Sequence, residues 1–219
     1  MAYMRREERR SQILEGAAIF FAENGLTGQT RELSASLGIT QPLLYRYFSS
    51  KEKLLDCIFK ELFEKRWVSS WRDLIKNDSL LISERLTIFY KEFDARILTR
   101  AWVRLFVFSG LVGYSYNKRV FRKLMTEIFR PICVELRLFY GLPRVQPSDI
   151  TQHEIEMVWE LHGVIFYHRM RQHVYGVKHT PPIDEIISNL LFYLEGAAPR
   201  VLSRLFPNYS INISDRGKP

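Results

Sequence analysis

The stretch Thr30-Arg-Glu-Leu-Ser-Ala-Ser-Leu-Gly-Ile-Thr-Gln-Pro-Leu-Leu-Tyr-Arg-Tyr-Phe48 predicts two short helices joined by a tight turn. Leucines one helical turn apart give the first helix an apolar stripe. Gly38 supplies the positive φ that a left-handed turn residue needs. Thr40 is placed to cap the second helix, and Pro42 lies in its first turn, where a missing N–H costs nothing. The pattern is that of a helix-turn-helix.

The second helix of this pair has an unusual outer face. Leu44 and Phe48 are one turn apart and hold the helix on the core. The side chains left to point outward or sideways are Gln41, Pro42, Leu43, Tyr45, Arg46 and Tyr47. A glutamine can pair bidentately with adenine, and apolar groups can touch a thymine methyl, so this face suits the major groove of DNA. The alternative is a surface helix of an unrelated bundle.

Residues 26–55 resemble the DNA-binding domain of the TetR family of transcriptional repressors. Three pieces carry the resemblance: the Gly38-Ile39 turn, the helix end Leu44-Tyr45-x-Tyr47-Phe48, and Lys51-Glu52-x-Leu54-Leu55. The match covers about the first quarter of the chain. Gly28-Gln29 departs from the small hydroxylated residues that the family often has there, and we assign the N-terminal cap of the second helix, which starts near this point, to Thr30.

The resemblance implies roles for individual residues. The side chains expected at base edges are Arg31, Gln41, Pro42, Leu43 and Tyr45. Those expected at phosphates are Thr30, Tyr47 and Lys51. Leu43 replaces a small or hydroxylated residue and could contact a base only through apolar atoms, which favours a thymine methyl.

The charge of the chain is unevenly distributed. The net charge of +8 fits a nucleic-acid partner, but residues 1–95 carry 15 basic and 14 acidic side chains, 96–144 carry 10 and 2, and 145–219 carry 7 and 8. Affinity for DNA would therefore rest on a few local contacts such as Arg31, Arg46 and Lys51.

The central basic stretch has two interpretations. Charge runs usually form a solvated face, and this is the favoured one. The alternative is that Arg100 or Arg104 meets an anionic effector in a cavity, since a buried arginine needs a counter-charge. The aromatic side chains that would line this cavity are Trp102, Phe106, Phe108 and Tyr114.

Helical periodicity accounts for the rest of the chain. A helix is predicted over residues 5–24, and Ser49-x-x-Glu52 is a capping box before an apolar pattern that can run toward Ile75. Further helices are predicted over 81–98, 102–116, 117–140 with a kink near Pro131, 152–175, and 184–206 with an interruption at Gly196 and Pro199. We therefore expect an all-α fold: an N-terminal three-helix helix-turn-helix domain (1–48) and a C-terminal helical bundle (49–219) for ligand binding and dimerisation.

Several classes of function lack support in the sequence. There is no Gly-rich phosphate loop, His-Glu-x-x-His or Gly-x-Ser-x-Gly, so no enzyme activity and no cofactor are expected. No two of His162, His168 and His173 are one turn apart, which favours hydrogen-bonded core or dimer-face histidines over a metal site. Two cysteines, no signal-peptide pattern and no stretch of roughly 18 apolar residues point to a cytoplasmic protein that does not enter a membrane.

The function we expect is that of a ligand-responsive repressor. In the resembled family the last two long helices pair across a two-fold axis, and a homodimer would read two half-sites of a palindromic double-stranded DNA operator ~34 Å apart. A small-molecule effector of unknown identity would release it. The competing interpretations are a small-molecule carrier or enzyme with an incidental helix-turn-helix, and an activator of the same family.

Overall fold

The structure, a computed structural model, describes residues 6–211 apart from the side chain of Tyr193. Within this part of the chain every regular element is helical, which confirms the predicted all-α class. The helices are α1 (Arg6–Asn24), α2 (Thr30–Ser36), α3 (Gln41–Tyr47), α4 (Lys51–Leu62), α5 (Trp71–Lys76), α6 (Ile82–Arg96), α7 (Arg100–Leu111), α8 (Tyr116–Leu124), α9 (Arg130–Phe139), α10 (Gln152–His173) and α11 (Ile183–Leu205). Two 3₁₀ turns, η1 (Glu64–Arg66) and η3 (Pro147–Asp149), and a π-helical segment, η2 (Met125–Phe129), complete the set.

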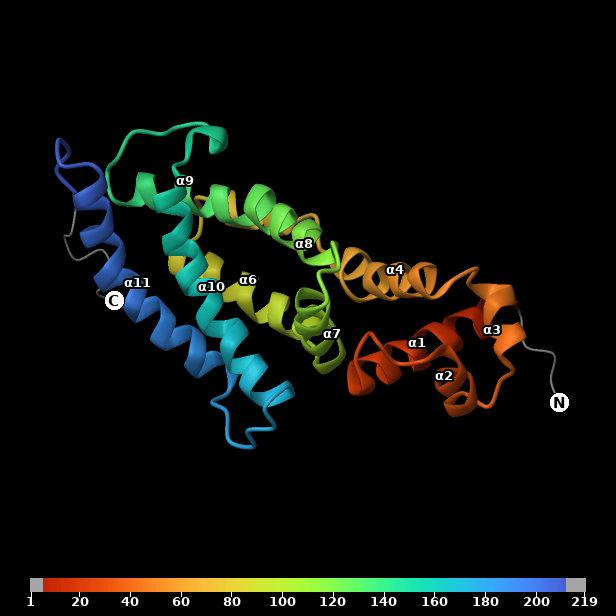
Figure 1. Ribbon diagram of the computed structural model, residues 1–219. Coiled ribbons are helices and arrows are strands. Elements are labelled where there is room, and N and C mark those ends of the chain that lie inside the picture. Colours follow the sequence, from red (N-terminus) through yellow and green to blue (C-terminus); the bar gives the residue numbers. More distant parts are fainter. Residues whose placement is uncertain (1–5, 212–219) are drawn as a thin grey trace.

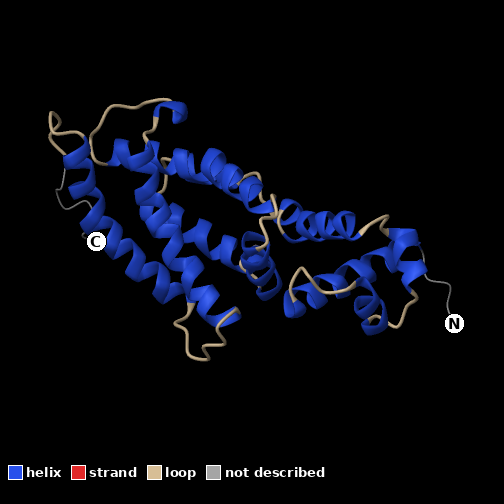
Figure 2. Cartoon of the chain, in the orientation of Figure 1, coloured by secondary structure: helices blue, strands red, loops and turns tan. Residues whose placement is uncertain are grey.

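The molecule is elongated, with two parts along its length (Figure 1). Helices α1 to α3 form the head at one end, and α5 to α11 form the body, in which α10 and α11 are neighbours. Helix α4 runs from the head to the body, and helices are connected only by loops and turns (Figure 2). Because α4 packs on both α1 and α7, the predicted division at residue 48 stays a prediction.

The turn of the head follows the predicted chemistry. Gly38 has φ +62°, with nothing within 4 Å of the place where a Cβ would lie. The side chain of Thr40 caps α3 by accepting a hydrogen bond from the backbone N–H of Leu43 at 3.3 Å. Leu33 and Leu44 are fully buried and hold α2 and α3 against α1. The predicted helix-turn-helix is therefore present.

Two predicted helix caps are wrong by one residue. Gln29, not Thr30, precedes α2, and its backbone N–H donates to Glu32 at 3.4 Å. Ser50, not Ser49, caps α4 by accepting from the N–H of Lys53 at 3.2 Å. Helix α2 thus starts one residue earlier than a cap at Thr30 predicts, and α4 starts one residue later than a cap at Ser49 predicts. Consecutive polar residues at a helix start make either position a plausible cap from sequence alone.

The long helix predicted to continue from α4 toward Ile75 is also wrong. α4 ends at Leu62, Phe63 follows as its C-terminal cap, and α5 begins only at Trp71. The Trp71 ring is buried, and its indole N–H donates to Glu92 of α6 at 2.8 Å. An uninterrupted helix would carry this ring away from α6, so burial of the indole and its hydrogen bond favour the break.

Both prolines inside the predicted helices are accommodated without ending them. Just before Pro131, the N–H of Arg130 donates a hydrogen bond to the carbonyl of Met125, five residues earlier. The helix distortion predicted near Pro131 is therefore the π-helical turn η2. The interruption predicted at Gly196 and Pro199 is wrong, because α11 is continuous from Ile183 to Leu205. A proline removes one backbone donor, and the neighbouring bonds and packing keep the helix intact.

Buried charges in the body are paired. Arg85 of α6 contacts Glu135 of α9 at 2.9 Å, and Arg137 of α9 contacts Glu154 of α10 at 3.0 Å. No group of three or more His, Cys, Asp and Glu side chains within residues 6–211 is placed to hold a metal ion. None of the helices in that range is both long enough and apolar enough to pass through a bilayer.

His162 lies in the core of the body, although it lacks the expected hydrogen bond at Nδ1. Its ring is surrounded by the rings of Phe93, Phe129 and Trp159. The ring of Tyr90, a titratable residue, also lies beside it. Burial lowers the pKa of His162 from 6.5 to about 4, because a charged imidazolium has no water or counter-charge there.

This lowered pKa predicts an acid-sensitive core. The unfolded chain takes up a proton at His162 below its ordinary pKa of 6.5, whereas the folded chain does so only near 4. Stability is therefore complete above pH 6.5 and is lost as the pH falls from 6.5 toward 4. From about pH 7.5 to about pH 5, wild type should lose roughly 2 kcal/mol more of its unfolding free energy than His162→Leu. Urea titrations at both pH values measure this difference, and parallel losses in the two proteins would contradict it.

Candidate functional site

The outer face of α3 is open, as predicted. Leu44 and Phe48 are 1% and 3% exposed and lie in the core. The exposed residues of α3 are Pro42, Tyr45 and Arg46, and the half-buried ones are Gln41, Leu43 and Tyr47. The head thus presents a compact surface in which polar, apolar and aromatic groups alternate.

Thr30 connects this surface to α2. Its hydroxyl oxygen accepts a hydrogen bond from the side-chain amide of Gln41 at 2.9 Å and lies 3.0 Å from the hydroxyl of Tyr45. Gln41 and Tyr45 are one helical turn apart, so a single side chain at the start of α2 orients both. Their positions are therefore set before any ligand arrives, which lowers the entropic cost of binding.

Three cations flank α3. Arg31 is exposed on α2, Arg46 is exposed on α3, and Lys51 is half-buried at the start of α4 with its ammonium 5.5 Å from the centre of the Phe21 ring. The structure thus brings the nine predicted DNA-contacting residues to α2, α3 and the first residue of α4.

The predicted effector residues do not form one cavity wall. Trp102 and Phe106 are buried and stacked on each other with ring centres 4.8 Å apart. Phe108 lies near Gly25 of the head, and the Tyr114 hydroxyl donates to Asp56 of α4 at 2.9 Å. Only the first two lie among the aromatic side chains of the body, so the set as effector contacts stays a prediction.

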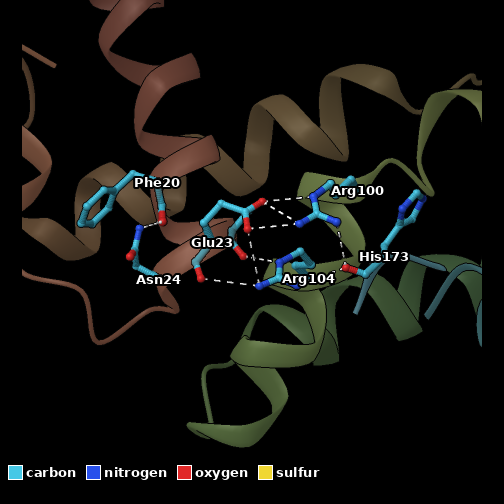
Figure 3. Close-up of polar contacts among 7 residues, drawn as sticks. Phe20, Glu23, Asn24, Arg100, Arg104 and His173 are labelled. Atoms are coloured by element: carbon cyan, nitrogen blue, oxygen red, sulfur yellow. Dashed lines mark hydrogen bonds and ion pairs between the residues drawn. The ribbon is translucent and has the colours of Figure 1, made fainter. Parts of the chain in front are cut away.

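Arg100 and Arg104 lie where the head meets the body (Figure 3). Arg100 donates to both carboxylate oxygens of Glu23, at 3.1 Å each, and to the carbonyl of His173 at 3.3 Å. Arg104 donates to the carbonyls of Ala22 and His173, the latter at 3.1 Å. We name these five residues the interdomain clamp. The Arg104 side chain is 15% exposed and departs from the favoured interpretation of a solvated face, whereas the Arg100 side chain is 53% exposed and agrees with it.

Helix ends explain why the interdomain clamp forms. Ala22 and Glu23 belong to the last turn of α1, and His173 ends α10, so each contributes carbonyls that have no partner within its own helix. Such ends carry partial negative charge, which favours cations. The hydrogen bond from Arg100 also lowers the pKa of Glu23. Two arginines on the first turns of α7 thus satisfy the ends of two helices at once.

A second junction joins α4 to the body. Asp56 accepts from Tyr114, and Arg119 of α8 lies 3.4 Å from the same carboxylate oxygen. The Phe59 ring stacks on Tyr116 with centres 3.8 Å apart. Burial, helped by the bond to Asp56, raises the pKa of Tyr114 to about 12. The head is therefore held to the body through both α1 and α4.

Sequence reasoning missed Glu23, His173 and Asp56. One local signal pointed to Glu23: it is an acidic residue in the last turn of a helix that has no basic residue there. That arrangement opposes the helix dipole and calls for a cation from elsewhere. His173 takes part through its backbone carbonyl, which no side-chain pattern reveals.

A segment at the start of the chain matches a known family model. Residues 13–58 match the model described as bacterial regulatory proteins of the tetR family. The HTH-type transcriptional repressor KstR2 of Mycobacterium tuberculosis is 32% identical over 89 residues, which is 40% of this chain and 44% of that protein. KstR2 of Rhodococcus jostii is 34% identical over 91 residues, which is again 40% of this chain and 44% of that protein. The match spans less than half the length of these curated relatives.

Solved structures extend the likeness to most of the chain. A TetR-like transcriptional regulator from Rhodococcus sp. RHA1 superposes with a TM-score of 0.65 and 16% identity, covering 90% of this chain and 99% of that one. The structure of the ketosteroid transcriptional regulator KstR2 of Mycobacterium tuberculosis superposes with a TM-score of 0.62 and 20% identity, covering 88% of this chain and 95% of that one. At these identities the likeness concerns the fold.

The interdomain clamp predicts a measurable loss when one arginine is removed. Arg104→Met keeps the apolar stem but removes the donors to α1 and α10, at an expected cost of about 2 kcal/mol in unfolding free energy. Amide hydrogen exchange should accelerate in the last turns of α1 and α10. Arg122→Met, at an exposed arginine of α8, is the control. Equal protection in the two variants would show that Arg104 does not hold these ends.

Proposed function

Because this chain belongs to the TetR family of bacterial regulatory proteins, we propose that it is a transcriptional repressor that binds a palindromic operator as a homodimer and leaves it when an effector binds. The observation that carries this proposal is the open face of α3, whose Gln41 and Tyr45 are held in place by Thr30. A solvated helix has no need of such a fixed arrangement. A groove-reading helix does.

Each residue of this face has a proposed role. Arg31, Gln41, Pro42, Leu43 and Tyr45 contact base edges, and Thr30, Arg46, Tyr47 and Lys51 contact phosphates. Thr30 acts chiefly by orienting Gln41 and Tyr45, because its hydroxyl oxygen already contacts both. The amide of Gln41 favours adenine, and Leu43 favours a thymine methyl.

The proposed dimer forms through α10 and α11. Three large apolar or aromatic side chains on these helices are exposed: Val164, Tyr167 and Phe192, the last at 80%. A groove along α11 is lined by Phe192, Gly196, Ala197, Arg200, Val201 and Arg204. Gly163 and Gly196 leave open space at the surfaces of α10 and α11, which lets a partner helix approach closely. Such an apolar patch is typical of an interface.

The switch is proposed to act through the two junctions. Residues 1–48 bind DNA and 49–219 bind the effector and dimerise. Effector binding in the body favours an arrangement in which α7 and α10 no longer meet the end of α1 at one place. The interdomain clamp and the Asp56 junction then pass this shift to the head, and affinity for the operator falls by the difference in effector affinity between the two states.

The DNA-binding proposal is tested with shift assays on DNA upstream of the protein's own gene, over a salt series. Gln41→Ala should lower specific affinity about tenfold or more and leave the salt slope unchanged, because a base contact is lost. Lys51→Ala should reduce the salt slope by about one, because a phosphate contact is lost. Lys178→Ala, at an exposed lysine of the loop between α10 and α11, is the control. An absence of salt-dependent binding would reject the proposal.

The dimer proposal predicts a matched contrast between two exposed apolar residues. Phe192→Glu should give a monomer at micromolar concentration, because a charge enters the apolar interface. Leu111→Glu makes the same change at a residue that is 78% exposed at the end of α7, and it should leave the dimer intact. Sedimentation equilibrium distinguishes the two. A wild-type monomer, or equal effects of both changes, would contradict the proposed interface.

A further inference from the structure

Two polar side chains in the core of the body lack partners. Tyr90 of α6 is 0% exposed and His162 of α10 is 5% exposed, with ring centres 6.1 Å apart. Within the described residues, neither the Tyr90 hydroxyl nor His162 Nδ1 has a hydrogen-bond partner. Buried polar groups are nearly always paired, so two adjacent orphans call for an explanation.

Aromatic rings enclose this pair. Phe93, Phe129 and Trp159 present edges or faces to His162 with ring centres 5.4, 5.2 and 6.1 Å away. Phe129 belongs to η2, and π-helical turns within α-helices occur frequently at functional sites. The surroundings therefore combine apolar rings, inclined to the imidazole by 60° to 77°, with two unused hydrogen-bonding groups, a combination of apolar lining and few polar groups that is typical of small-molecule sites.

A series of rings leads from this place to the surface. Trp159 is half-buried and lies 5.1 Å from Phe121, measured between ring centres. Phe121 on α8 is 39% exposed. An apolar molecule entering between α8 and α10 would thus replace ring contacts with its own and would reach His162 without crossing a charged layer.

The charges on the neighbouring helices are engaged elsewhere. Glu92 accepts from the indole of Trp71, and Glu127 accepts from Lys123 at 2.9 Å. Asp94 forms an ion pair with Arg169. Burial keeps His162 neutral at physiological pH by lowering its pKa to about 4. Lys123 and Arg169 already contact carboxylates, so neither is free to pair with a carboxylate bound here.

We propose that the effector binds at Tyr90 and His162 by replacing the ring contacts around them, and that it is a planar, uncharged, apolar molecule with one carbonyl oxygen. The carbonyl accepts a hydrogen bond from the Tyr90 hydroxyl, with His162 beside it as the second polar neighbour. The assignment rests on the proposed function in naming this ligand an effector. It also differs from the sequence-based expectation of an anion at Arg100 or Arg104, whose guanidinium groups hold the interdomain clamp.

The test uses three matched probes and the full chain without DNA. Calorimetry measures binding of 2-acetylnaphthalene, which is a neutral ketone, naphthalene, which lacks the oxygen, and 2-naphthoate, which is an anion. The ketone should bind roughly tenfold more tightly than either of the others, as one hydrogen bond to a buried donor allows. In Tyr90→Phe the advantage over naphthalene should vanish, while naphthalene binds as before. Lys178→Ala, at an exposed lysine of the loop between α10 and α11, should leave all three affinities unchanged.

Stability gives an independent signature. Removing a buried hydroxyl that has no partner should leave the urea midpoint of Tyr90→Phe equal to or above that of wild type. A lower midpoint would show that the hydroxyl is bonded within the protein, and it would overturn the proposal. So would absent ketone binding, an unchanged ketone advantage in Tyr90→Phe, or naphthoate binding as tightly as the ketone.

The shift assay with ligand-free protein separates the two proposals. If DNA binds but the ketone does not, the site assignment fails and the proposed regulator stands. If the ketone binds with the expected pattern but no DNA binds, the site stands and the regulatory function fails.

Discussion

The carbonyl of His173 at the end of α10 accepts from both Arg100 and Arg104, which also bind the Glu23 carboxylate and the Ala22 carbonyl at the end of α1, and this contact fastens the head to the body. The ends of α1 and α10 come from segments about 150 residues apart in the chain, and α7 supplies Arg100 and Arg104 between them. The last turn of α1 has no basic side chain of its own, whereas the last turn of α10 has Arg171 and His173. The orientation of α1 is therefore set by two helices of the body and not by the head alone.

The second junction differs in chemistry from the first. At α4, the stacked rings of Phe59 and Tyr116 supply apolar contact, and Asp56 receives both a tyrosine hydroxyl and an arginine. Stacked rings can slide with little loss of contact, whereas several charged hydrogen bonds to fixed carbonyls hold one geometry. In the proposed switch the head is accordingly fastened more tightly at α1 than at α4.

Much of the head could be predicted because its signals are local. Gly38, Thr40 and Pro42 fix a turn through their own backbone preferences, and Leu33 and Leu44 fix which faces turn inward. The body was harder to predict. The apolar pattern past Leu62 is helical, yet the chain breaks there because Trp71 needs Glu92, a partner that only the tertiary structure supplies.

In the candidate site, too, local features could be predicted from the sequence, whereas features that depend on tertiary contacts could not. The exposure of Tyr45 follows from helical spacing, but its contact with Thr30 depends on how α2 crosses α3. The roles of Arg100 and Arg104 could not be read from a run of basic residues, since their partners are mostly backbone carbonyls. Trp102 and Phe106 are buried, in keeping with a helix that is apolar on nearly every face, but their predicted contact with an effector stays a prediction.

The early end of α4 limits how far its movement can carry the head. Twelve helical residues span roughly 18 Å, so a tilt of about 10° about Phe63 moves the far end by about 3 Å. Successive base pairs are separated by 3.4 Å. A rigid arm of this size thus converts a small angular change beside the body into a mismatch of about one base-pair step at the head. A helix reaching Ile75 would have needed only half that angle for the same displacement.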